Sequence, residues 1–363
     1  MDILIRNNII KKNKFIIDIG TYATKILQIR YAAKKAEILD AQSIIYKGIL
    51  EERKFNFTDL AKKIDTLISG QGRSDVVISL PAELCECKII NVKNKKESEI
   101  PKVIKKDYTT FGRANPVTHV VDFAFIGKRE EDGDTVYYYF LSAVHKSIAA
   151  DLIAAFAKYK MKVKTIVSST YNQICLSELF FDEYDHLNRL FIDFGTNTTR
   201  ITAFSEGVAV YTRNIELGFN SYEKSLFDVQ EKAGKPEIVR ALINIGEYTD
   251  LATELIGGYF RELDKDVYRK CIDEVDNHFI SNISRVIDLC ESNDFAVSKI
   301  YYSGYVLKGF EDKLEERLNI ETKQIVFSAF DKKAGKGYTL EIGDTDMNGE
   351  YSNALGLCIS PYI

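Results

Sequence analysis

The chain has 363 residues, more than the roughly 250 to 300 at which a single hydrophobic core stops growing, so two lobes are expected. Hydrophobic residues make up 45% and charged residues 28%, an ordinary globular composition that argues against general disorder. The formal net charge of −4 argues against a nucleic-acid-binding protein. No apolar run approaches the roughly 20 residues that span a bilayer, and the six scattered cysteines fit a reducing cytoplasm.

The first predicted elements are a hairpin and a βαβ module. After an N-terminal arm, residues 1–14, an apolar run leads into Asp18-Ile19-Gly20-Thr21, whose composition is typical of a tight turn, and a second strand follows. Apolar residues at helical spacing over 56–68 and the buried strand 76–80 complete the module.

The character of the chain changes after Pro81. An alternating strand over 84–92, a helical stretch over 97–111 and strands over 117–126 and 135–144 predict a small α+β insertion. Aromatic residues on its last strand could line a groove for an extended peptide, although alternating aromatics on strands are mostly core residues.

The first hairpin then recurs as an internal repeat, which decides architecture. Asp193, Gly195, Thr196, Thr199, Arg200 and Ile201 stand where the first copy has Asp18, Gly20, Thr21, Thr24, Lys25 and Ile26. Backbone amides in such a turn form an anion-binding concavity, and hydroxyls and a lysine add donors for phosphate. Two copies therefore predict phosphate binding, with one aspartate from each half holding a divalent cation through its waters.

Long helices dominate the remainder of the chain. Pro236 opens one helix, and residues 275–290 form another. A strand over 299–302 runs into Ser303-Gly304-Tyr305, which predicts a third turn facing the nucleotide, and small residues let a terminal helix approach the first hairpin closely.

Two Asp-x-Gly-Thr hairpins and a late strand-Ser-Gly-helix element resemble the actin-like ATPase superfamily over nearly the whole chain. Within it, the insertion together with Ile100–Asp107 and Leu141–Ile148 looks like the PilM proteins of type IV pilus assembly, relatives of FtsA of cell division. FtsA ends in an amphipathic membrane helix, whereas Cys358–Ile363 lacks a basic, apolar-faced pattern, so PilM is the expected relative.

The resemblance implies an α/β, actin-like ATPase (ribonuclease H-like) duplicated two-lobed fold with a small α+β subdomain inserted in the first lobe. The expected boundaries are residues 1–80 and 148–188 for the first lobe, 81–147 for the insertion, 189–350 for the second lobe, and 351–363 for a terminal helix that returns to the first lobe.

The resemblance also implies a site for ATP and Mg²⁺. The implied nucleotide-binding residues are Asp18, Gly20, Thr21, Thr24, Lys25, Asp193, Gly195, Thr196, Asn197, Thr198, Gly218, Glu237, Arg240, Ser303, Gly304, Tyr305 and Gly356. Asp18 and Asp193 would hold the metal through water. Glu237 and Arg240 look like the purine-contacting pair, or else form an ordinary i,i+3 surface ion pair.

Two departures from the family concern adenine binding and catalysis, in that order. Relatives usually have two or three glycines in the turn where this chain keeps only Gly304, with Tyr305 beside it. Relatives also often have an acidic residue where Val167–Thr170 supplies none, so nothing there can act as a base for an attacking water. We therefore expect at most a slow ATPase.

The implied function is a cytoplasmic nucleotide-binding scaffold, peripheral at the inner face of the cytoplasmic membrane. It would dock the N-terminal tail of a PilN-like bitopic membrane protein and relay signals to the pilus motor complex, with self-association left open and no nucleic-acid partner. Two alternatives also remain open: an FtsA-like cell-division filament protein, and an actin-fold ATPase or kinase with real turnover.

Overall fold

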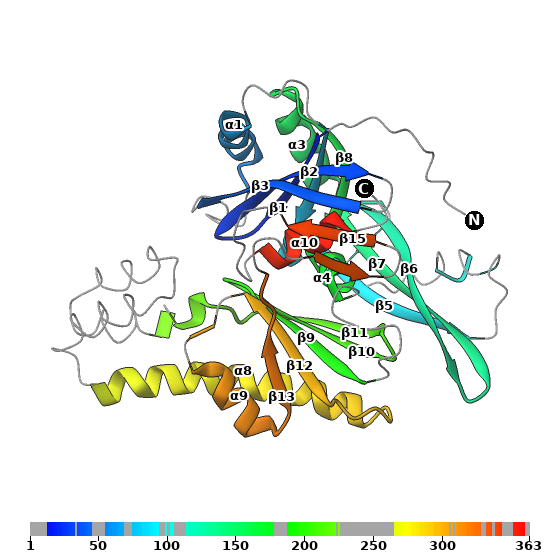
Figure 1. Ribbon diagram of the computed structural model, residues 1–363, viewed down its shortest axis with the longest axis vertical. Coiled ribbons are helices and arrows are strands. Elements are labelled where there is room, and N and C mark those ends of the chain that lie inside the picture. Colours follow the sequence, from blue (N-terminus) through cyan, green and yellow to red (C-terminus); the bar gives the residue numbers. More distant parts are fainter. Residues whose placement is uncertain are drawn as a thin grey trace. The chain divides into compact units, whose positions relative to one another are not determined.

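A computed structural model of the chain shows two compact units (Figure 1). Unit 1 comprises Met1–Leu187, Thr202–Thr212 and Ile325–Ile363, and unit 2 comprises Asn188–Ile201 and Arg213–Gln324. The residues that the structure describes are 13–32, 35–45, 55–68, 75–93, 99, 102–104, 114–115, 117–177, 187–222, 224–225, 265–304, 306–307, 309–327, 332–335, 338–342 and 351–359. None of the helices described is long and apolar enough to cross a membrane.

Unit 1 is built on a seven-stranded sheet with the order β14-β15-β3-β2-β1-β4-β8. Its strands are β1 (Asn13–Ile19), β2 (Ala23–Ala32), β3 (Lys35–Ile45), β4 (Asp75–Leu80), β8 (Lys162–Ser168), β14 (Lys332–Gly335) and β15 (Tyr338–Ile342). The first three strands are antiparallel neighbours, while β1, β4 and β8 run parallel. The nearly continuous apolar runs of β1 and β4 fit this position, because a parallel sheet is covered on both faces.

Helices cover both faces of this sheet. On one face, α1 (Phe57–Leu67) and α3 (Lys146–Ala157) pack on alternate residues of β1 and β4 in one hydrophobic cluster. On the other, α10 (Ser352–Cys358) packs against α4 (Ser169–Ser177) and contacts β1, β2 and β4. The terminal helix is therefore part of unit 1.

The insertion forms its own antiparallel sheet of β5 (Cys85–Lys93), β7 (Asp134–His145) and β6 (His119–Glu131), in that order, after the short 3₁₀ turn η3 (Ala82–Leu84). Ile90, Leu141 and Ile104 are buried together on one face of this sheet. The helix predicted over 97–111 falls largely outside the described residues. Within that range, residues 102–104 are described and helical.

The second sheet has the order β11-β10-β9-β12-β13. Its strands are β9 (Arg189–Phe194), β10 (Thr199–Ser205), β11 (Val208–Ile215), β12 (Lys299–Gly304) and β13 (Glu321–Gln324). This order repeats the β3-β2-β1-β4-β8 order of unit 1, so the internal repeat of the sequence is a structural duplication. Edge-to-face aromatic contacts centred on Phe194 join the sheet to α8 (Lys265–Glu291) and α9 (Phe310–Leu318).

The boundaries of the second lobe differ from expectation, since Thr202–Thr212 and Ile325–Ile363 belong to unit 1. The second lobe was expected to run to residue 350, but β15 pairs in parallel with β3, with Leu340 opposite Ala36, so β14 and β15 extend the sheet of unit 1. An alternating strand pattern shows that a strand forms, but it does not show which sheet edge the strand joins.

The hairpin formed by β10 and β11 packs on the insertion sheet within unit 1. Val208 is buried with Val136 and Tyr138, and Arg129 forms an ion pair with Glu206 at 3.8 Å. Gly127, at a bulge in β6 with φ +151°, leaves so little space that an added Cβ would lie 2.8 Å from a Val208 methyl.

Replacing Gly127 with Ala should therefore lower the free energy of unfolding by about 1–3 kcal/mol, because the new methyl overpacks this contact. Gly133→Ala is the matched control: Gly133 also has positive φ, but nothing lies within 4 Å of an added Cβ. Urea denaturation should show a smaller loss of unfolding free energy for the control. In a Val208→Ala background, Gly127→Ala should lower the free energy of unfolding by less than it does in the original chain. An unchanged effect would contradict the contact between Gly127 and Val208.

Candidate functional site

The two repeated hairpins turn with the same atomic geometry. In the first, Gly20 N donates to Ala23 O at 3.1 Å, and in the second Gly195 N donates to Thr198 O at 3.0 Å. An added Cβ would lie 2.5 Å from Ala23 O at the first glycine and 2.6 Å from Thr198 O at the second. Each turn closes too tightly for any other residue, which explains why glycine recurs.

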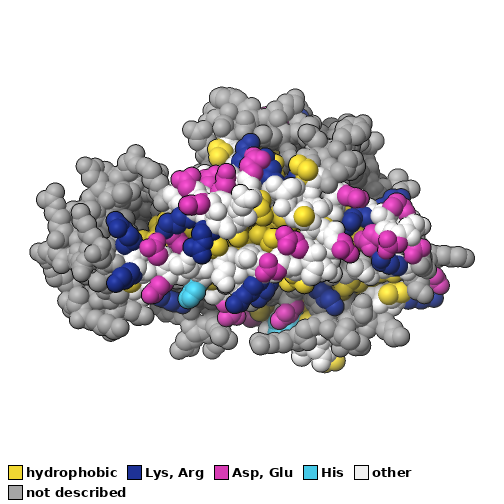
Figure 2. Space-filling view, turned by 90° about the horizontal axis from the view of Figure 1, so that it is seen from below, with side chains coloured by type: hydrophobic (Ala, Val, Ile, Leu, Met, Phe, Trp, Pro, Cys, Tyr) yellow, Lys and Arg dark blue, Asp and Glu magenta, His cyan; other side chains and the backbone are white. Residues whose placement is uncertain are grey.

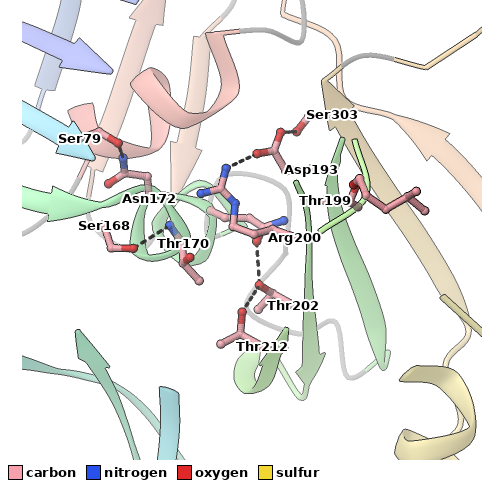
Figure 3. Close-up of polar contacts among 12 residues, drawn as sticks. Ser79, Ser168, Thr170, Asn172, Asp193, Thr199, Arg200, Thr202, Thr212 and Ser303 are labelled. Carbon is pink, nitrogen blue, oxygen red and sulfur yellow. Dashed lines mark hydrogen bonds and ion pairs between the residues drawn. The ribbon is translucent and has the colours of Figure 1, made fainter. Parts of the chain in front are cut away.

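Asp193, next to the last residue of β9, is a buried carboxylate with two polar partners (Figure 3). Its Oδ2 accepts from Arg200 on β10 in an ion pair, and its Oδ1 accepts from Ser303 Oγ on β12 at 3.1 Å. All three residues are at most 7% exposed. Because a buried charge is tolerated only when it is paired, this contact ties three neighbouring strands together at the base of the turn.

Unit 1 has the same three residue types at the matching positions. Asp18 on β1 lies directly opposite Lys25 on β2 and Ser79 on β4 in the sheet register, and all three are buried. Ser79 Oγ accepts from Asn172 Nδ2 of α4 at 2.8 Å (Figure 3). Ser79 was missed in the sequence, although it ends the apolar run of β4 as Ser303 ends that of β12.

A turn that begins at Gly218 packs backbone to backbone on the second hairpin. Phe219 N donates to Gly195 O at 3.0 Å and Asn220 N to Thr196 O at 2.8 Å. An added Cβ at Gly218 would lie 2.4 Å from Thr196 O. Asn220, which sequence analysis did not place in the site, also donates from its side chain to Asn197 Oδ1 at 2.5 Å.

A polar network anchors this turn to the helices of unit 2. Tyr222 donates to Asp276 of α8 at 2.5 Å, and Lys313 of α9 reaches Asp276 at 2.5 Å and Asp273 at 2.9 Å. Burial, together with the negative charge of Asp276, raises the pKa of Tyr222 above its ordinary range, so the phenol remains a donor.

Gly304 holds the end of β12 against β9. Its φ is +90°, and an added Cβ would lie 2.2 Å from Phe194 O, so glycine is required both for the backbone conformation and for the close approach. Gly356 of α10 has a similar role in unit 1, where an added Cβ would lie 2.0 Å from Asn172 O of α4.

The remaining expected ligand residues differ in accessibility. Thr21, Thr196, Asn197 and Thr198 are half-buried at the turns. Thr24, in contrast, is fully buried, and its Oγ1 has no hydrogen-bond partner among the described residues. Glu237, Arg240 and Tyr305 lie outside the described residues.

The residues at the two glycine turns fit a phosphate group better than they fit a metal ion. The glycine turns are tight and flanked by half-buried threonines, a set of donors suited to phosphate. Both oxygens of Asp193 already have a partner within the fold, and the residue is nearly inaccessible. No cluster of three or more His, Cys, Asp or Glu suited to a metal lies within the described ranges.

The segment at the end of β8 is buried and uncharged. Ser168, Ser169 and Thr170 are at most 3% exposed, and Ser168 Oγ accepts from Thr170 N at 3.2 Å. No carboxylate occurs in this segment, where a catalytic base would be expected.

A second feature of unit 1 is an apolar groove of about 380 Å³ between the insertion and the rest of the unit. Its lining residues are Val120, Asp122, Phe123, Ala124, Phe140, Ser142, Val144, Ala149, Ile153, Val163, Lys164, Thr165, Ile166, Val167, Ser168 and Tyr171. Because consecutive residues of β8 line it, the groove runs along the edge of this strand. Among the described residues, both β8 and β6 are the last strands of their sheets.

The similarity of this chain to known proteins is visible in structure rather than in sequence. No protein-family model matches the sequence, and no curated protein matches it. A chain of the PilM-PilN type IV pilus biogenesis complex, at 16% identity, matches 97% of this chain and 100% of its own length with a TM-score of 0.72. The chain has the PilM fold. The expected duplicated, actin-like architecture with its insertion is thereby confirmed.

Two other solved structures match at lower similarity. One is a protein with actin-like ATPase fold and unknown function from Bacteroides thetaiotaomicron, at 8% identity, with 87% of this chain and 91% of that chain covered and a TM-score of 0.46. The other is ethanolamine utilization protein EutJ from Carboxydothermus hydrogenoformans, at 10% identity, with 96% and 89% covered and a TM-score of 0.46. We base no argument on either; the PilM fold rests on the first match.

The buried pair in unit 2 generates a stability prediction. Arg200→Met should cost about 3–5 kcal/mol in urea denaturation, because it leaves the Asp193 carboxylate buried without its cation. Arg30→Met, which removes an exposed pair with Glu37 at 3.3 Å, should cost at most about 1 kcal/mol. Adding Asp193→Asn to Arg200→Met should recover part of the loss. Equal costs for the two single variants would show that the buried pair does not hold the strands together.

Proposed function

We propose that this chain is a nucleotide-responsive scaffold of type IV pilus assembly that docks the N-terminal tail of a PilN-like bitopic membrane protein. The groove of unit 1, in a chain with the PilM fold, is the observation that carries the proposal. In this role the protein would be cytoplasmic, peripheral at the inner face of the membrane, and would relay the state of the tail to the pilus motor complex.

The groove suits an extended peptide. The last strand of a sheet presents unpaired backbone N–H and C=O groups, which a peptide can use by adding as a further strand. β8 and β6 both offer such an edge, and apolar side chains such as Val120 and Ile153, 50% and 48% exposed, would be covered by the peptide. Ser142 and Asp122 provide polar groups that fix the orientation of a ligand.

The nucleotide part of the proposal rests on the two hairpins. Thr21 and the backbone of the Gly20 turn would bind phosphate oxygens from unit 1, and Thr196 and Thr198 would do so from unit 2. Asp18 and Asp193 are the carboxylates proposed to hold Mg²⁺ through water, and the ion would neutralise phosphate charge. The uncharged end of β8 supports binding without rapid hydrolysis.

The peptide proposal predicts that a synthetic copy of the partner's cytoplasmic tail binds in the groove. Ile153→Asp should weaken binding about 10- to 100-fold, because it removes the burial of one large aliphatic side chain. Leu289→Asp is the matched control, since Leu289 is a similarly exposed apolar residue, at 40%, on α8 and outside the groove. Fluorescence anisotropy with a labelled peptide measures both. Equal affinities of the two variants for the peptide would show that the peptide does not bind in the groove.

The nucleotide proposal predicts that magnesium ATP raises the melting temperature, because a ligand that binds only the folded state contributes about 2.7 kcal/mol at 100 times its Kd. Thr21→Ala together with Thr196→Ala should reduce the shift, while Thr66→Ala on the exposed face of α1 should not. Phosphate release should stay far below about 1 per second. A faster turnover would identify an enzyme instead of a scaffold.

A further inference from the structure

Four lysines gather at the end of the unit 1 sheet where β8 begins. Lys158 and Lys160 lie in the turn between α3 and β8, and Lys162 and Lys164 occupy alternate positions at the start of the strand. All four are exposed, and the residues between them are buried or half-buried, so the chain directs the four charges to the solvent. These four residues are named here the basic edge.

Little acidic charge balances the basic edge. Lys164 forms an ion pair with Asp75 at the start of β4, at 3.3 Å, whereas Lys158, Lys160 and Lys162 form no ion pair with any described residue. Lys14 on β1 adds a further positive charge. Burial lowers the pKa of Lys14, the negative charge of Asp75 opposes that shift, and the positive charge of Lys164 adds to it, so Lys14 lies within the electrostatic reach of the basic edge.

The basic edge is locally positive, although the whole chain has a formal net charge of −4. On the face drawn in Figure 2, acidic and basic side chains occur together between apolar ones, as on an ordinary soluble surface. An uncompensated cluster of one sign, in contrast, attracts a partner of the opposite charge.

The position of the basic edge favours a membrane as that partner. Val163 and Lys164 both line the groove, so the basic edge is continuous in the chain with the groove lining. This step rests on the proposed function, because a short tail that emerges from the bilayer can reach the groove only if the groove lies near the headgroups. The acidic net charge disfavours nucleic acid.

We propose that the basic edge binds the anionic headgroups of a phospholipid bilayer and thereby presents the groove to the membrane surface. The contact is electrostatic and needs no inserted helix. Each lysine near an anionic surface strengthens binding about fivefold, and the effect falls steeply as salt shortens the screening length.

The experiment is cosedimentation of the full chain with vesicles of phosphatidylglycerol and phosphatidylcholine, and with vesicles of phosphatidylcholine alone. The variant is Lys158→Gln, Lys160→Gln and Lys162→Gln together, which leaves the groove residue Lys164 in place. The matched control changes three exposed lysines elsewhere, Lys88→Gln, Lys270→Gln and Lys323→Gln, for the same loss of charge. Melting temperatures of both variants verify that they are folded.

The expected result is binding that requires phosphatidylglycerol, weakens with salt, and falls on the order of 100-fold in the variant but only a few-fold in the control. Equal loss in the two variants, or binding to phosphatidylcholine alone, would overturn the inference. So would lysine-dependent binding of an acidic tail peptide without any binding to vesicles. Vesicle binding with no affinity for the tail peptide would instead overturn the proposed function and leave this inference standing.

Discussion

A buried carboxylate near the end of β1 in unit 1 and of β9 in unit 2 is the constraint on which the two glycine turns depend. In unit 2 the Asp193 charge is tolerated because Arg200 neutralises it and Ser303 donates to it. These partners come from the strands on either side, so the charge fixes the register of β10, β9 and β12 together. In unit 1, Asp18 stands between Lys25 and Ser79 in the same way.

This arrangement separates the charges that build the turns from the groups that would contact a ligand. The aspartates and their cations are nearly inaccessible, whereas the threonines of the two turns are half-buried and reach the surface. In unit 2 the Asp193 charge is thus neutralised within the fold, which agrees with the proposal of a site for binding and sensing a ligand. Rapid hydrolysis would need a positioned base as well, and the uncharged residues Ser168–Thr170 do not supply one.

The groove and the basic edge share one strand, β8, which closes the unit 1 sheet on one side. Natural proteins usually protect such an edge with charges or cover it, because it can pair with another chain. Here lysines stand at the beginning of the strand, and the insertion forms the opposite wall along the rest of it. In the proposed function, the lysines would protect this edge from uncontrolled pairing, while the groove would leave it accessible to a peptide.

The sequence by itself determined the duplication, the two glycine turns and the three strands of the insertion, because these depend on local periodicity and turn chemistry that neighbouring residues encode. The tertiary structure decided which distant segments meet. Ser303 reaches Asp193 across 110 residues, Ser79 emerged as its counterpart only through the strand register, and β15 joined the first sheet. The groove also lies between segments far apart in the chain, and no local pattern specifies which strand edges remain unpaired once both sheets have formed.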